Sequence, residues 1–279
     1  MKDYTLTPVD IEGLEKSYIL ESDNTDKLLL SPGRHLLGYE RQKVAFAATV
    51  QWLEGMKHFG HLPQDNMELC TLTILAEGAG HNLPGALQTV LGEKENYRGD
   101  NWLGVSRFAL PESEAKPGLH YRDYDAQVKY VRINSPAPIW VVLDTVATGA
   151  TLVRGLEAAF ANAPRPKRIL MGSPAGSPVG MRKLQALCNN AGVEFISTFF
   201  GAAFALHEDG SGLPWCHPET ILSGSLRSQG NIRRAEKRFN LSPAFCSVGD
   251  CSANFFDVSA ALDHLKQEEE RLGWSLPRD

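Results

Sequence analysis

The stretch VVLDTVATGAT, residues 141–151, decides the fold class that this sequence predicts. It continues an apolar run that begins at Ile139, and an unbroken apolar run is typical of a strand buried on both faces. Asp144 then leads into a turn of small and hydroxyl-bearing residues, and a helical pattern follows from about Thr151. A buried strand, a short turn and a helix form the repeating unit of a parallel α/β sheet.

The same order of elements occurs twice more along the chain. Residues 69–92 and 167–192 each read as a strand, a glycine-rich turn and a helix, and 39–60 reads as a further helix. We therefore predict an α/β fold with a doubly wound, mostly parallel sheet. It forms a single domain over 1–279, which includes an N-terminal helical segment at about 1–60.

Ligands of such sheets bind beyond the carboxyl ends of the strands. The turns at 76–81, 144–150 and 173–177 are therefore expected to meet at one edge. The polar stretch 111–127 follows a predicted strand at 102–110. It is long for a connection within a compact domain, and such a length is typical of a lid or a binding loop.

Composition excludes several classes of partner. The net charge of −5 offers no general attraction to nucleic acid or to an anionic membrane, and no window holds the roughly 18 apolar residues of a membrane span. The 5 cysteines include no CxxC pair, which favours reduced thiols and a cytoplasmic location. His207, Cys216 and His217 fit no common zinc spacing, so no metal site built from protein ligands is predicted.

The turn after Asp144 has the chemistry of a sugar-phosphate site. A helix N-terminus presents unpaired N–H groups and a partial positive charge, which together bind phosphate. Gly149 permits a close approach of the backbone, and Thr148 and Thr151 add hydroxyl donors. The Asp144 carboxylate accepts hydrogen bonds from neutral hydroxyls, so a ribose 5-phosphate would suit both ends. The alternative is that these residues only cap the helix.

This strand, acid and TGAT turn resemble the phosphoribosyl diphosphate (PRPP) motif of type I phosphoribosyltransferases. More of the chain, roughly 35–260, is similar to the uracil phosphoribosyltransferase branch. The stretches that carry this likeness are TILAEGAGHNLPGAL (73–87), GVSR (104–107), YRDYDAQVKY (121–130) and SVGDCSANFF (247–256). The resemblance implies the type I fold, with a flexible lid loop and a small hood. It also implies transfer of a phosphoribosyl group from PRPP to a pyrimidine-like or related heterocyclic base, with release of pyrophosphate.

The resemblance also implies a role for each matching residue. Asp144 would fix the ribose hydroxyls and Arg107 would clamp the pyrophosphate. The PRPP-binding residues would be Thr145, Ala147, Thr148, Gly149, Ala150, Thr151, Gly78, Ala79 and Gly80. The base would be bound by Gly249 and Asp250, and the lid would carry Tyr121, Arg122 and Tyr124. Mg²⁺ would accompany PRPP, the partners would be PRPP and a base or nucleotide, and a homodimer would be compatible with the sequence.

Three departures from the family pattern keep other functions open. Leu143 stands where the motif commonly has its first acid, Glu77 stands where the uracil branch has arginine, and 205–243 is an insertion. Either Arg107 and Arg122 offset the charge of Glu77, or the ligand there is not pyrophosphate. The alternatives are a non-catalytic nucleotide-binding protein that regulates or interacts with a partner, or an enzyme that uses another acceptor or hydrolyses a nucleotide.

Overall fold

A computed structural model describes most of the chain. The described residues are 3–31, 36, 38–62, 68–75, 77–92, 97–111, 118–228, 232, 246, 266–267, 270–271 and 273. Within them, one large sheet has the strand order β1-β2-β8-β7-β6-β3-β4-β5. Its strands are β1 (Tyr4–Pro8), β2 (Ser17–Ser22), β3 (Leu69–Leu75), β4 (Tyr97–Ala109), β5 (Tyr124–Arg132), β6 (Ile139–Leu143), β7 (Arg168–Ser173) and β8 (Glu194–Phe200).

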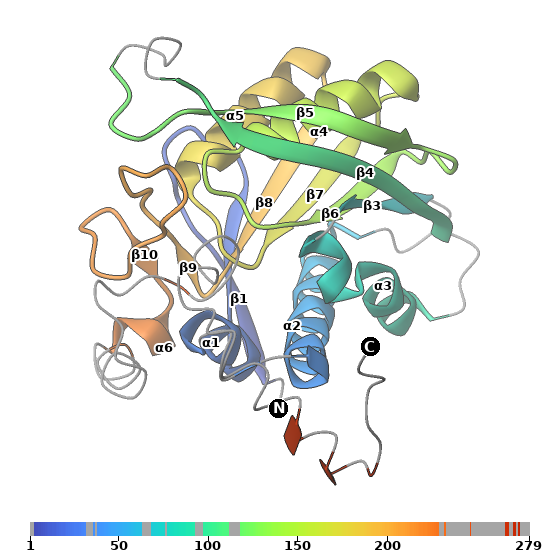
Figure 1. Ribbon diagram of the computed structural model, residues 1–279. Helices are drawn as coiled ribbons and strands as arrows, with labels where there is room; N and C mark the ends of the chain where they lie inside the picture. The colour runs from blue at the N-terminus through green and yellow to red at the C-terminus, as the bar shows by residue number, and fades with distance from the viewer. Residues whose placement is uncertain are drawn as a thin grey trace.

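The interior of the sheet is parallel. Strands β2, β8, β7, β6, β3 and β4 run in one direction, and β1 and β5 add antiparallel edges. Both faces carry helices: α4 (Ala150–Asn162) and α5 (Pro178–Ala191) cover one, and α2 (Gly38–His58) and α3 (Leu83–Leu91) cover the other (Figure 1). The predicted doubly wound, mostly parallel sheet is confirmed.

The apolar runs are explained by this layering. Every residue of β6 is buried. Trp140 and Val142 pack in the cluster under α4 and α5, whereas Val141 and Leu143 pack in the cluster under α2 and α3. Because side chains alternate across a strand, a strand covered on both faces needs an apolar residue at every position.

A third apolar cluster lies beside the carboxyl edge. It is built from α1 (Asp23–Leu30) and from the segment that holds β9 (Ala202–Ala203), β10 (Ile221–Leu222) and α6 (Gly224–Arg227). Phe204 and Trp215 pack together within it, with ring centroids 4.8 Å apart. Ala175, in the loop after β7, belongs to the same cluster, so the predicted insertion at 205–243 contacts this edge over its described part.

The N-terminal segment differs from its predicted form. Residues 1–60 were expected to be helical, and they contain α1 and α2 but also β1 and β2, which extend the sheet beyond β8. The predicted lid stretch 111–127 is also shorter, because Tyr124 already begins β5. None of the helices within the described residues combines the length and apolar character of a membrane-spanning segment.

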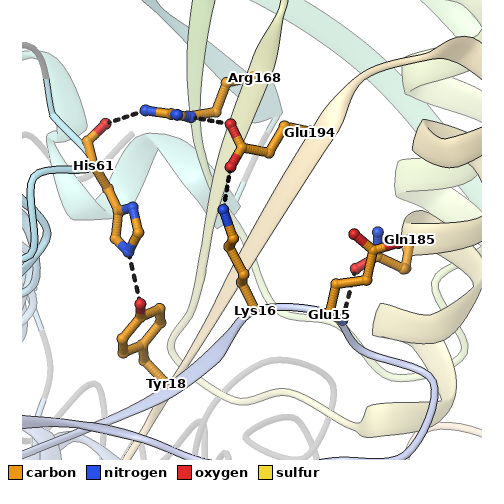
Figure 2. Close-up of polar contacts among 7 residues, drawn as sticks. All are labelled: Glu15, Lys16, Tyr18, His61, Arg168, Gln185 and Glu194. Carbon is orange, nitrogen blue, oxygen red and sulfur yellow. Dashed lines mark hydrogen bonds and ion pairs between the residues drawn. The ribbon is translucent and has the colours of Figure 1, made fainter.

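The amino ends of the strands are joined by a polar network, shown in Figure 2. The Glu194 carboxylate accepts hydrogen bonds from Lys16 Nζ and from Arg168 Nε, each at 2.6 Å. Arg168 also donates to the carbonyl oxygen of His61, whose Nε2 lies 2.7 Å from the Tyr18 hydroxyl. These contacts hold β2, β7 and β8 together at the edge opposite the predicted ligand site.

Candidate functional site

The loops at the carboxyl edge are bonded to one another. Val146 N donates to Ala175 O at 3.0 Å, and Ser177 N donates to Val146 O at 2.7 Å. Val146 and Gly176 form a parallel bridge, and Gly176 forms another with Ala203. The loops after β6 and β7 therefore meet at one edge, as predicted, and the segment after β8 joins them there.

The loop after β3 joins the same edge. A Cβ atom placed on Gly78 would lie 3.1 Å from the carbonyl oxygen of Leu143, at the end of β6. The predicted pyrophosphate loop and the TGAT turn therefore begin from adjacent points on the sheet.

Asp144 lies at the point where β6 passes into its loop. The residue is 6% exposed, and its backbone N donates to Gly172 O at 3.2 Å. Leu143, at the position where the motif commonly has its first acid, is 1% exposed and packs in the cluster under α2 and α3. One carboxylate therefore stands at the end of this strand, in the place that the sequence predicted for a ribose-binding acid.

Helix α4 begins within the TGAT stretch, at Ala150, without a side-chain cap. Gly149 occupies its N-cap position with φ at 78°, and no side-chain capping bond is made there. The neighbouring helix α5 differs, because the Ser177 hydroxyl caps it by accepting from Gly180 N at 3.1 Å. The alternative, that the turn serves only as a helix cap, therefore has no capping bond to support it. The first N–H groups of α4 have no partner within the helix, which suits them to an anion.

Thr148 has a buried hydroxyl without a partner. The residue is 1% exposed, and its Oγ1 makes no hydrogen bond to any of the residues that the structure describes. A buried hydroxyl that lacks a hydrogen bond costs about 1–3 kcal/mol. Such a cost at the residue directly before the N-cap of α4 is typical of a group that serves a ligand.

The loop 147–149 is held against the first turn of α5. The Ser177 hydroxyl donates to Ala147 O at 2.5 Å. A Cβ atom on Gly180 would lie 2.6 Å from Ala147 O and 2.9 Å from Gly149 N. The backbone of the loop thus contacts the backbone of the neighbouring helix, and this contact fixes the loop before any ligand arrives.

Arg107 and Tyr124 are brought together by the β4–β5 pair. The Arg107 guanidinium lies 4.3 Å from the centroid of the Tyr124 ring, which is the distance of a cation–π contact. The register pairs Leu75 with Gly104, so Arg107 lies on the part of β4 that continues past the end of β3. Two residues predicted for separate roles, a pyrophosphate clamp and a lid, therefore form one unit.

The carboxyl-terminal end of the predicted lid is attached to the insertion. Arg122 N donates to Glu208 O at 2.6 Å, and the Tyr124 hydroxyl donates to Asp209 O at 3.0 Å. The Asp209 side chain in turn accepts from the backbone N of Ser211 and Gly212, which fixes this turn. The insertion thus positions the segment that carries the predicted lid residues.

A cavity of about 290 Å³ lies between this segment and α4. Its walls are Leu110, Asp123, Tyr124, Asp125, Ala150, Val153, Arg154, Glu157 and Lys183. Arg154 forms a bidentate ion pair with Asp125, with N–O distances of 2.9 and 3.2 Å. Ala150 places the first turn of α4 on the wall of the cavity, so the cavity lies beside the predicted phosphate site.

The predicted pyrophosphate loop is the 3₁₀ helix η2 (Glu77–His81). Gly78 is buried, whereas Ala79 and Gly80 are exposed. The two exposed residues line a second cavity, of about 400 Å³, together with Tyr39, Gln42, Lys43, Phe46 and Asn82. Asn82 has φ at 46°, and a left-handed conformation is uncommon for a residue other than glycine.

His81, the last residue of η2, is buried. It is 4% exposed, and its Nδ1 has no hydrogen-bond partner in the described part of the chain. Burial together with the charge of Arg41 lowers its pKa to about 4. The imidazole is therefore neutral at pH 7. No local pattern in the sequence distinguishes this histidine from an exposed one.

Some predicted residues cannot be placed. Gly249 and Asp250, predicted to bind the base, and the side chain of Glu77 lie outside the described residues.

Sequence reasoning missed two residues of the site, Ser177 and Lys183. Ser177 had a signal, because a serine followed by a proline often begins a helix. Lys183 had none, since its position depends on the packing of α5 against the TGAT turn.

No model of a known protein family matches the chain, and no curated protein matches it. Solved structures do match the chain. One is the adenine phosphoribosyltransferase of Trypanosoma brucei in complex with AMP, pyrophosphate and ribose 5-phosphate, at 14% identity and a TM-score of 0.41, covering 80% of this chain and 98% of that one. Another is the adenine phosphoribosyltransferase of Thermoanaerobacter pseudethanolicus, at 15% identity and a TM-score of 0.32, covering 57% and 81%. A third, the hypoxanthine-guanine phosphoribosyltransferase of L. donovani, has 15% identity and a TM-score of 0.31, covering 61% and 84%. The chain is thus similar, at low identity, to solved phosphoribosyltransferases.

Proposed function

We propose that this protein transfers a phosphoribosyl group from PRPP to a pyrimidine-like or related heterocyclic base, as the uracil phosphoribosyltransferase branch does. One observation supports the proposal most. The N-terminus of α4, which has no side-chain cap, follows a loop that carries a buried acid, Asp144, and a buried hydroxyl without a partner, that of Thr148. Phosphate suits the helix terminus, and ribose hydroxyls suit the carboxylate.

The phosphate end of PRPP would be bound by the loop 145–151. The N–H groups of Ala150 and Thr151 would donate to the phosphate oxygens, and Thr148 would donate its hydroxyl. The contact between Gly149 and Gly180 supports this role, because a loop held in place before binding loses little conformational freedom when the ligand arrives.

The pyrophosphate end would lie between η2 and Arg107. The exposed Ala79 and Gly80 offer backbone N–H groups, and the Arg107 guanidinium offers a bidentate donor. Mg²⁺ would neutralise charge on the leaving pyrophosphate. The described residues contain no group of three acid, histidine or cysteine side chains that could hold a metal. PRPP oxygens and water would therefore supply most ligands, which suits the coordination habits of Mg²⁺.

The chemistry would be a displacement at C1 of the ribose. The bond from C1 to the pyrophosphate oxygen breaks, a bond from a ring nitrogen of the base forms, and the proton of that nitrogen passes to solvent. The protein contributes positioning and charge stabilisation. Tyr121, Arg122 and Tyr124 would cover the ligand as its lid and exclude water. Gly249 and Asp250 remain the proposed base-binding residues, and we propose a cytoplasmic role in pyrimidine salvage.

A non-catalytic nucleotide-binding protein is the second candidate. The observation that favours it is the burial of Leu143, because the strand end offers one carboxylate where the family motif commonly has two. Such a protein would bind a nucleoside monophosphate through the same loop and would release no pyrophosphate.

The test is an incubation of the full chain with PRPP, Mg²⁺ and a panel of pyrimidine and purine bases, followed by measurement of pyrophosphate. We expect release that depends on a pyrimidine-like base, and we expect Asp144→Asn to reduce turnover by about 100-fold with an unchanged circular dichroism spectrum. Binding of a nucleoside monophosphate without pyrophosphate release from any base would favour the second candidate. Full turnover in Asp144→Asn would remove this acid from the site.

A further inference from the structure

The cavity of about 290 Å³ contains a lysine that the family motifs do not include. Lys183 belongs to α5 and lines the cavity together with Ala150 of α4. The two helices lie side by side on the same face of the sheet (Figure 1). The wall of the cavity therefore joins the N-terminus of α4 to a cationic side chain from a different helix.

The packing of α5 explains this position. Gly180 contacts the loop 147–149 through its backbone. Side chains three residues apart lie on the same face of a helix, so Lys183 emerges from the face that contacts this loop. The direct contact between Gly180 and Gly149 also brings the N-terminal ends of the two helices together.

The other cation of the cavity wall is already paired. Arg154 binds Asp125 through two hydrogen bonds and donates to Glu157 at 3.2 Å. Lys183, in contrast, has no carboxylate at ion-pairing distance within the described part of the chain. Its Nζ lies 5.5 Å from the centroid of the Tyr121 ring.

The Lys183 ammonium is partly desolvated. Partial burial lowers the pKa of Lys183, and the charge of Asp123, a buried residue of the same cavity wall, offsets only part of this effect. An ammonium in such a place gains more from a nearby anion than a fully solvated one does. The buried, unpartnered hydroxyl of Thr148 independently marks the adjoining turn as the place where a ligand binds.

We propose that Lys183 binds the phosphate group of the ligand that occupies the TGAT turn. This inference rests on the proposed function, and it adds to it a charged residue from α5. A lysine acts as a point charge toward phosphate, and the N–H groups of α4 would supply the directional hydrogen bonds. The ring of Tyr121 would keep the ammonium beside the helix terminus until the phosphate arrives.

The experiment measures binding of ribose 5-phosphate and of inorganic phosphate by calorimetry. The variants are Lys183→Met, Lys183→Arg and the control Lys129→Met, which removes the same charge from an exposed position on β5. We expect Lys183→Met to weaken both ligands by about tenfold or more, Lys183→Arg to retain most of the affinity, and Lys129→Met to match the wild type. Thermal unfolding of each variant confirms that it is folded, and Lys183→Gln replaces Lys183→Met should the latter fail to fold.

The outcomes separate this inference from the proposed function. If the wild type binds neither ligand, both are overturned. If the wild type binds ribose 5-phosphate and Lys183→Met binds it equally well, the assignment of Lys183 alone is overturned. A loss of affinity for ribose 5-phosphate but not for inorganic phosphate would also overturn it, because the lysine would then contact the sugar.

Discussion

Gly149 and Gly180 contact each other through their backbones, and neither position has space for a side chain. A Cβ atom on Gly149 would lie 2.9 Å from Gly180 O and 3.0 Å from Gly180 Cα. This contact joins the TGAT turn to the helix that carries Lys183, so the geometry of the proposed phosphate site depends on two glycines that are 31 residues apart in the sequence.

Gly149→Ala should therefore destabilise the protein and abolish phosphate binding. The new methyl group would push the loop away from α5, and overpacking of this kind costs about 1–3 kcal/mol, in addition to the strain of alanine at φ 78°. Chemical denaturation measures the loss, and calorimetry with ribose 5-phosphate measures binding.

Gly192→Ala is the matched control for this variant. Gly192 has φ at 70°, and a Cβ atom placed there would have nothing within 4 Å. Alanine at this position therefore introduces the same backbone strain but no steric clash with a neighbouring residue. The difference between the two variants isolates the contact with Gly180. Equal losses of stability would mean that this contact has no energetic role.

Thr148→Val should change stability and binding in opposite directions. Valine keeps the shape of the side chain but removes the buried hydroxyl that has no partner, so the free protein should gain about 1 kcal/mol in its free energy of unfolding. Binding of ribose 5-phosphate should weaken, because the ligand loses a donor. Thr148→Ser, which keeps the hydroxyl, should bind nearly as well as the wild type. A valine variant that is less stable and binds normally would show that the hydroxyl serves the fold.

Glu194→Gln tests the network at the opposite edge of the sheet (Figure 2). Partial burial acts to raise the pKa of Glu194, but hydrogen bonds from Lys16 and Arg168 and their charges outweigh it, so the pKa is lowered. A lowered carboxyl pKa stabilises the fold above the pKa of the unfolded state, and this contribution is lost as the pH falls. In denaturation experiments we expect the variant to lose about 1 kcal/mol at pH 7 and less at pH 3. Its affinity for ribose 5-phosphate should stay unchanged, because the network is remote from the proposed site.

Glu40→Gln is the control for that variant, since Glu40 pairs with Lys43 at 2.8 Å on an exposed helix face. An exposed pair of this type contributes about 0.5 kcal/mol or less. A stability loss for Glu194→Gln no larger than that of the control, or one that does not shrink at low pH, would contradict a structural role of the network.

The interior of the sheet and the placement of the loops could be predicted because both depend on local patterns. The unbroken apolar run of β6 indicates burial on both faces, and the order of strand, turn and helix fixes a parallel arrangement. The edge strand β1 was missed because it is short and only Leu6 is buried in it. A strand with so little apolar character gains its structure from pairing with β2 rather than from its own sequence.

The sequence predicted which residues come together at the site only where those residues belong to one motif. Asp144 and Thr148 belong to the same turn, and the sequence places them together. The contact of Tyr124 with Asp209 joins residues that are 85 positions apart, and it depends on how the insertion folds. Lys183 reaches the cavity because close packing at the first turn of α5 brings two helices together. Contacts of this kind have no local signal, since they depend on tertiary packing.

The burial of His81 makes the stability of the fold depend on pH. Burial and the charge of Arg41 lower its pKa to about 4, whereas an unfolded histidine has a pKa of about 6.5. As the pH falls from about 6.5, the unfolded state takes up a proton before the folded state does, so stability present above this pH is lost progressively down to about pH 4. The difference in pKa corresponds to roughly 3 kcal/mol.

Asp26 titrates in the same window with the opposite sign. Burial raises its pKa to about 6, so the folded state takes up this proton first and gains stability as the pH falls. His81→Phe keeps a ring but does not titrate. The difference between its free energy of unfolding and that of the wild type therefore measures the contribution of His81. Asp26→Asn, compared with the wild type in the same way, measures the contribution of Asp26. The free energy of unfolding of His81→Phe should fall less steeply between about pH 6.5 and pH 4 than that of the wild type. Parallel curves would mean that the imidazole is solvated and takes up its proton in the folded state as readily as in the unfolded one.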